Sequence, residues 1–131
     1  MKNQINKVKE FNKAFNIKDV SPMLRYEMIY EELEEYYDSC YESSGCLVVE
    51  KMDKLDIDRV EQADAIGDML YLLMGAVIDA GLEDKIEAIF DEIHRSNMSK
   101  LENGKPLYRD DKKVMKGKDY FPPNIKAILD K

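Results

Sequence analysis

Residues 21–42 read SPMLRYEMIYEELEEYYDSCYE, and this stretch predicts the long helix on which the fold depends. Ser21 is a typical N-cap, and Pro22 suits the first helical position, where a missing N–H costs no hydrogen bond. Residues then recur at steps of four and three, the spacing of one inward face of a helix. This face begins apolar and becomes acidic: Leu24, Met28, Glu31, Glu35, Asp38 and Glu42. We therefore expect Glu31 and Glu35 to lie beside the core.

Apolar spacing predicts three further helices, at about residues 3–16, 58–80 and 83–100. The helix at 58–80 is expected to begin at Asp58, which has Glu61 three residues on as in a capping box. No alternating strand pattern occurs before residue 105, so the fold class is predicted as all-α, with a four-helix-bundle-like arrangement. The length predicts one domain, 1–131. We expect residues 1–101 to form the bundle, and residues 102–131 to form a short, irregular, basic extension that lies over it. In that extension Tyr120 and Phe121 are the expected anchors, and Asn124 is placed to cap a last short helix.

The chain is acidic, and its charges are unevenly distributed. The 131 residues include 27 Asp/Glu and 20 Lys/Arg, for a formal net charge of −7, which disfavours nucleic acid as a partner. Residues 100–131 reverse the balance, with nine Lys/Arg against five Asp/Glu. Two readings stay open for this tail: a solvated segment without a role, or lysines that meet phosphates brought in by a metal ion.

Cysteine usage and hydropathy indicate a cytoplasmic protein without a membrane partner. Cys40 and Cys46 have neither zinc-site spacing nor the number needed for a disulfide framework. The N-terminus lacks the continuous apolar core of a signal peptide, and the longest apolar run, residues 69–78, is about half as long as a membrane span requires.

A second acidic group lies on the predicted helix at residues 58–80. Glu61, Asp64 and Asp68 are spaced i, i+3 and i+7, which places them within an arc of about 60°. Asp68 precedes the apolar run at residues 69–74, where an ionised carboxylate is costly unless it binds a cation. Two acidic arcs on neighbouring helices supply the hard oxygen ligands that Mg²⁺ and Mn²⁺ prefer. The alternative is that these acids are ordinary exposed helix formers, with Glu61 only capping its helix.

At this point four stretches of the sequence resemble one superfamily, the all-α nucleoside triphosphate pyrophosphohydrolases. That superfamily contains MazG, the dimeric dUTPases and the phosphoribosyl-ATP pyrophosphohydrolases. RYEMIYEELEE at residues 25–35 is similar to the superfamily's EExxE helix, and ADAIGDMLY at residues 63–71 to its second acidic helix. HRSNMSK at residues 94–100 and the segment 103–123, from NGKP to YFPP, resemble MazG-like members. The resemblance spans nearly the whole chain and implies a MazG-type fold.

The resemblance also implies a reaction, a metal ion and a role for each site residue. The reaction converts a (d)NTP to the (d)NMP and pyrophosphate, with Mg²⁺ as cofactor and Mn²⁺ as a substitute, in nucleotide house-cleaning or pool control. Glu32 is the expected base for the water that attacks the α-phosphorus. The expected metal ligands are Glu31, Glu35, Asp64 and Asp68, with Glu61 as a further candidate. Because the leaving pyrophosphate needs cationic and polar partners, the substrate-binding candidates are Asn97, Lys100, Lys116, Arg25 and Tyr120. For Arg25 the alternative is an ion pair with an acid of its own helix or of a neighbouring one. Homodimers or homotetramers are expected.

One motif departs from the superfamily's pattern. The second acidic helix usually carries ExxD, but with Asp68 as its Asp the Glu position is Ala65. Glu61 and Asp64 satisfy ExxD one turn earlier. Which of these acids binds each ion is therefore left open.

Two other functions remain as alternatives. The first is phosphoribosyl-ATP pyrophosphohydrolase activity, and the second is a non-enzymatic helical module that binds a cation or a partner. For Phe11 and Phe15 we expect core packing, with a wall of the base pocket as the alternative.

Overall fold

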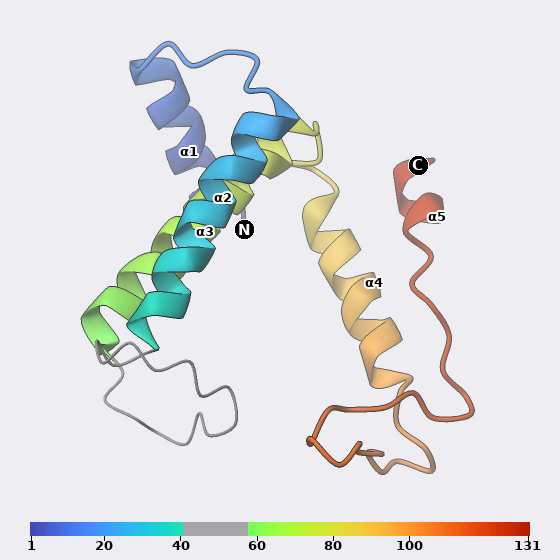
Figure 1. Ribbon diagram of the computed structural model, residues 1–131. Coiled ribbons are helices and arrows are strands. Elements are labelled where there is room, and N and C mark those ends of the chain that lie inside the picture. Colours follow the sequence, from blue (N-terminus) through green and yellow to red (C-terminus); the bar gives the residue numbers. More distant parts are fainter. Residues whose placement is uncertain (41–57) are drawn as a thin grey trace. The chain divides into compact units, whose positions relative to one another are not determined.

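The computed structural model describes residues 1–40 and 58–131, and its regular elements are α-helices (Figure 1). These are α1 (Lys2–Ala14), α2 (Pro22–Ser39), α3 (Arg59–Asp79), α4 (Ile86–Met98) and α5 (Ile125–Leu129). The described residues contain no strand beyond two isolated bridge pairs. The predicted all-α fold class is confirmed. The predicted end of the second helix at Glu42, the predicted loop at 43–57 and Cys46 lie outside the described residues.

The described chain forms two compact units, residues 2–81 and residues 82–131 with Met1. In the first unit α3 packs against both α1 and α2. Helices α2 and α3 run antiparallel, because the start of α2 meets the end of α3 at Arg25 and Asp79. At the opposite end the Gln62 amide lies 3.5 Å from the Cys40 Sγ.

Both helices of this antiparallel pair begin at the predicted caps. The Ser21 Oγ accepts a hydrogen bond of 3.1 Å from the Leu24 N–H, and Pro22 occupies the first turn. The Asp58 Oδ1 accepts from the N–H groups of Val60 and Glu61, at 3.0 and 3.1 Å. These bonds satisfy N–H groups that have no partner within their own helix.

The inward face of α2 differs from the predicted one. The acids expected beside the core, Glu31 and Glu35, are exposed, as are Leu24 and Asp38. The shielded residues lie one helical step further round: Arg25, Met28, Ile29, Glu32, Tyr36, Ser39 and Cys40. Helix α2 has apolar residues on two faces, so spacing alone did not decide which face meets α3. Its rotation matches the pairing of Arg25 with Asp79.

The second unit consists of α4, α5 and the irregular segment between them. The Ser96 Oγ donates to the Phe121 carbonyl at 2.9 Å, and the Phe121 N–H donates to the Ser99 Oγ at 3.2 Å. The Asn124 Oδ1 accepts from the Ala127 N–H at 3.2 Å and caps α5, as predicted. Phe121 therefore anchors the extension, and its partner is α4. The prediction of one domain with a boundary near residue 101 stays a prediction.

None of the described helices combines the length and the hydropathy needed to cross a membrane.

Candidate active site

The clearest electrostatic anomaly among the described residues is the Glu32 carboxyl on α2. Its Oε2 atom is buried and has no hydrogen-bond partner. Burial is the largest cause of a raised pKa at this carboxyl, because a low-dielectric environment disfavours its charged form. The negative charges of four neighbouring acids raise the pKa further: Glu35, Asp68, Asp64 and Glu31. The five acids therefore share one electrostatic neighbourhood.

Two helices supply these acids. On α2 the Glu31 and Glu35 positions lie one turn apart, on the flank beside the face that carries Glu32. On α3 the Asp64 and Asp68 positions are also one turn apart and share a face. The antiparallel contact of α2 with α3 brings the Asp64 and Asp68 charges close enough to act on Glu32 together with those of Glu31 and Glu35. The sequence spacing predicted both pairs. It also predicted that Glu31 and Glu35 face the core, whereas Glu32 is the shielded acid of α2.

Asp68 does not have the burial that its apolar neighbours predicted. Its side chain is exposed, and so are those of Asp64, Glu31 and Glu35, whereas Glu32 is half-buried. Among these five acids, the free-energy cost of shielding a charge from water therefore falls mainly on Glu32. Glu61 is exposed in the first turn of α3, where its N–H donates to the cap residue Asp58. Its place among the metal ligands stays a prediction.

The acidic group offers carboxylate oxygens, which suit Mg²⁺ or Mn²⁺. Within residues 1–40 and 58–131, no three His, Cys, Asp or Glu side chains are already arranged to hold a metal ion. Carboxylates repel one another when no cation lies between them, so exposed side chains of this kind separate. The partnerless Oε2 of Glu32 and the surplus of negative charge around it fit a cation at this place.

Four substrate-binding candidates lie together in the second unit. The Lys100 Nζ donates to the Asn97 Oδ1 at 2.7 Å, at the end of α4. The Lys116 Nζ lies 4.5 Å from the centroid of the Tyr120 ring. The Gly117 N–H donates to the Lys100 carbonyl at 2.9 Å and so joins the two pairs. The first and last of the four residues, Asn97 and Tyr120, lie 23 positions apart in the sequence, and the packing of the extension on α4 brings the four together.

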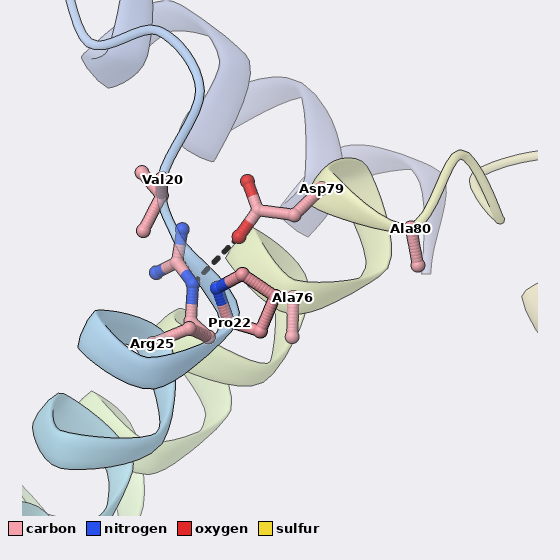
Figure 2. Close-up of a pocket in the computed structure, with 6 residues that line it drawn as sticks. All are labelled: Val20, Pro22, Arg25, Ala76, Asp79 and Ala80. Carbon is pink, nitrogen blue, oxygen red and sulfur yellow. Dashed lines mark hydrogen bonds and ion pairs between the residues drawn. The ribbon is translucent and has the colours of Figure 1, made fainter.

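Arg25, the fifth candidate, has another contact (Figure 2). Its Nε donates to the Asp79 Oδ2 at 2.8 Å, and this ion pair borders a pocket of about 380 Å³. The lining residues are Val20, Pro22, Arg25, Ala76, Asp79 and Ala80. Asp79 follows Asp68 by eleven residues, about 16 Å along α3. Arg25 therefore pairs with an acid of the neighbouring helix, as its alternative prediction held, and it lies about 10 Å along α2 from Glu32. Its contact with substrate stays a prediction.

Sequence reasoning missed several residues that position the extension. Ser96 and Ser99 hold Phe121, and the Glu92 carboxylate accepts from the Asn124 N–H at 2.6 Å. A small polar residue on an otherwise apolar helix face was the available signal for Ser96, which is buried.

A comparison with known protein families identifies the family of this chain. A family model described as phosphoribosyl-ATP pyrophosphohydrolase matches residues 2–97. The chain belongs to this family. The match includes every acid around Glu32 and extends to Asn97, whereas Lys100, Lys116 and Tyr120 lie beyond it. A comparison with curated proteins found no match.

Membership in the phosphoribosyl-ATP pyrophosphohydrolase family confirms two predictions. The chain is a member of the MazG-like all-α superfamily, as its motifs indicated. It is also a pyrophosphohydrolase, an enzyme that acts on acid anhydrides.

Proposed function

We propose that this pyrophosphohydrolase hydrolyses nucleoside triphosphates, converting a (d)NTP and water to the (d)NMP and pyrophosphate in a Mg²⁺-dependent reaction. The observation that supports the proposal is the Glu32 carboxyl, half-buried, with a partnerless oxygen, amid four further acids. A site of this charge binds a triphosphate only through cations, because the two anions would otherwise repel each other.

The five acids have two tasks in this proposal. Glu31, Glu35, Asp64 and Asp68 hold Mg²⁺, which neutralises phosphate oxygens and increases the acidity of water when bound. Mn²⁺ substitutes because it prefers the same oxygen ligands. Glu32 accepts the proton of the water that attacks the α-phosphorus, because its Oε2 lies amid the four acids and is without a hydrogen-bond partner among the described residues. The water oxygen bonds to the α-phosphorus, and the bond from that phosphorus to the bridging oxygen of pyrophosphate breaks.

The leaving pyrophosphate needs cationic partners, and the lysines of the extension are the proposed ones. Lys100 and Lys116 each hold their ammonium group near a neutral partner, Asn97 and the Tyr120 ring respectively. Within residues 1–40 and 58–131 neither ammonium group pairs with a carboxylate, so both charges are available for a phosphate. We also propose a homodimer or homotetramer as the working assembly, which sedimentation at micromolar concentration tests directly.

Phosphoribosyl-ATP is the second candidate substrate, and the family match favours it. It carries the same triphosphate, so the same acids and the same bond cleavage serve both substrates. The two differ in the added ribose phosphate, which demands further cationic contacts.

A pyrophosphate-release screen separates these functions. The panel contains the common NTPs and dNTPs and phosphoribosyl-ATP, each with Mg²⁺, Mn²⁺ and a chelator. We expect release that depends on the metal and falls on the order of 100-fold or more in Glu35→Gln and Asp68→Asn. Glu34→Gln is the matched control, because Glu34 lies on the same helix but does not contribute to the raised pKa of Glu32.

The outcome of the screen decides among the candidates. Release from phosphoribosyl-ATP alone transfers the proposal to that substrate. No release from any compound contradicts the proposed activity and favours a helical module that binds a cation or a partner.

A further inference from the structure

Two phenylalanines that the sequence assigned to the core lie at the surface of α1. The Phe11 side chain is 39% exposed and the Phe15 side chain 66% exposed. Their ring centroids are 4.4 Å apart with an interplanar angle of 33°. Leaving large apolar rings in water costs free energy, so an exposed aromatic pair of this kind marks a surface that a ligand or partner covers.

Tyr71 connects this pair to the acidic group. The Phe11 ring meets the Tyr71 ring edge-on, with centroids 5.8 Å apart and an angle of 89°. Tyr71 follows Asp68 by three residues on α3, which is about 4.5 Å along the helix and about 60° round it. The aromatic surface therefore begins within one helical turn of an acid that shares the field of Glu32.

The two neighbouring surfaces match the two chemically different parts of a nucleotide. The acids, once cations are present, suit the phosphates, and the flat exposed rings suit an uncharged aromatic base. Aromatic side chains bind bases by stacking, and the strength of stacking increases with the area of the rings.

We propose that Phe15, with Phe11 beside it, is the stacking surface for the nucleobase, and that Tyr71 positions Phe11. This inference rests on the proposed function, since it names the part of the same site that binds the base. Because a purine offers more ring area than a pyrimidine, purine triphosphates bind more tightly than pyrimidine triphosphates to this surface.

Equilibrium binding tests the proposal without relying on turnover. The probes are α,β-methylene-ATP and inorganic tripolyphosphate, each with Mg²⁺, measured by calorimetry on the full chain. In Phe15→Ala we expect the affinity for α,β-methylene-ATP to fall about 10-fold, while that for tripolyphosphate changes less than about 2-fold. Phe15→Trp keeps the affinity for the nucleotide. The preference for α,β-methylene-ATP over α,β-methylene-UTP shrinks in Phe15→Ala.

Tyr26→Ala is the matched control, because Tyr26 is also an exposed aromatic residue stacked on a neighbour, Tyr30, at 6.0 Å. It is expected to leave both affinities unchanged. Equal losses for the two probes in Phe15→Ala, or no loss for either, overturn the stacking surface. If the wild-type chain binds the nucleotide with these losses but releases no pyrophosphate from any NTP, the proposed function fails while the stacking surface stands. If it releases pyrophosphate and Phe15→Ala binds the nucleotide normally, only the stacking surface fails.

Discussion

Two places along the α2–α3 contact differ in how their charged side chains are arranged: one holds an ion pair and the other a group of like charges. At one end the Arg25 guanidinium pairs with Asp79 at 2.8 Å, and the two side chains are only 11% and 25% exposed. Gly75 makes room for this pair, because a Cβ at that position would lie 2.5 Å from an Arg25 nitrogen. About 10 Å further along α2, Glu32 has a buried oxygen without a partner among the described residues, beside four acids.

This difference predicts separate roles within one helix pair, stability for the ion pair and cation binding for the acids. A paired, shielded charge stabilises the contact of the two helices, and removing one partner leaves the other uncompensated. A group of like charges destabilises the folded state until a cation binds. The Arg25–Asp79 pair therefore holds α2 against α3, whereas the repulsion among the acids is what a bound cation would relieve.

Glu32→Gln is expected to produce the largest effect. Loss of a general base lowers kcat by about 1,000-fold. The same substitution raises the melting temperature of the metal-free protein by roughly 2–5 °C, because the raised pKa of Glu32 shows that the folded state disfavours its charge. The stability gain shrinks as the pH falls through this raised pKa, where the wild-type carboxyl takes up a proton. Pyrophosphate release and thermal unfolding with a chelator measure the two changes.

An unchanged or lowered melting temperature in Glu32→Gln would contradict the inference that the folded state disfavours the charge of Glu32. Glu34→Gln removes the same charge from the same helix at an exposed position and serves as the control.

Arg25→Ala is expected to have the next largest effect, and on stability alone. Breaking a largely shielded ion pair costs about 2 kcal/mol, which lowers the melting temperature by roughly 5–10 °C. The affinity for Mg²⁺, measured by calorimetry at a temperature where both proteins are folded, stays the same. If instead the variant melts normally but its KM for nucleotide rises, Arg25 is a substrate residue, as the sequence indicated.

Local signals allowed most of the fold to be predicted from the sequence. The N-caps Ser21, Asp58 and Asn124 all form the expected hydrogen bonds, because each depends only on residues within three positions. The rotation of α2 about its axis was not predictable in this way. It depends on which of two apolar faces meets α3, and a contact 54 residues distant in sequence, Arg25 with Asp79, accompanies the outcome.

The candidate site was predictable as a composition but not as an arrangement. The spacing of Glu31, Glu35, Asp64 and Asp68 indicated two acidic faces, and the structure places all four around Glu32. Spacing within a helix does not reveal burial, which depends on the neighbouring helix, so the shielded acid was misassigned. The aromatic pair of α1 was misassigned for the same reason: periodicity shows that Phe11 and Phe15 share a face, not what covers that face.

Mg²⁺ is expected to stabilise the wild-type protein by an intermediate amount. Binding only to the folded state at ten times the dissociation constant contributes ~1.4 kcal/mol, or a few degrees in melting temperature. The shift disappears in Glu35→Gln and is unchanged in Arg25→Ala, so it distinguishes the acids around Glu32 from the Arg25–Asp79 pair. The reference solution contains NaCl at the same ionic strength, because salt alone screens the repulsion among the acids. A shift that NaCl reproduces in full would falsify a specific site.

The smallest expected effect is the contribution to stability of a paired carboxylate in the second unit, Glu92. Glu92 accepts two hydrogen bonds of 2.8 Å from the Arg95 guanidinium and one of 2.6 Å from the Asn124 N–H. Arg95 first, and then the Asn124 N–H, lower the pKa of Glu92 to about 2 from its ordinary 4.5. A lowered pKa in the folded state means that this contribution to stability is complete above pH 4.5 and is lost as the pH falls towards 2.

The Glu92 contact and the Glu32 carboxyl are thus expected to titrate on opposite sides of pH 4.5, and NMR detects both events in one sample. The amide shift of Asn124 should change with a midpoint near pH 2, and this change should be absent in Glu92→Gln. The side-chain carbon of Glu32 should change with a midpoint above 4.5 in the absence of metal. Midpoints that coincide near 4.5 would mean that the second unit does not hold Glu92 in a pair and that the acids on α2 and α3 lie too far apart to repel. In that case the acids around Glu32 would not raise its pKa, and Glu32 would have no electrostatic property that sets it apart from Glu92.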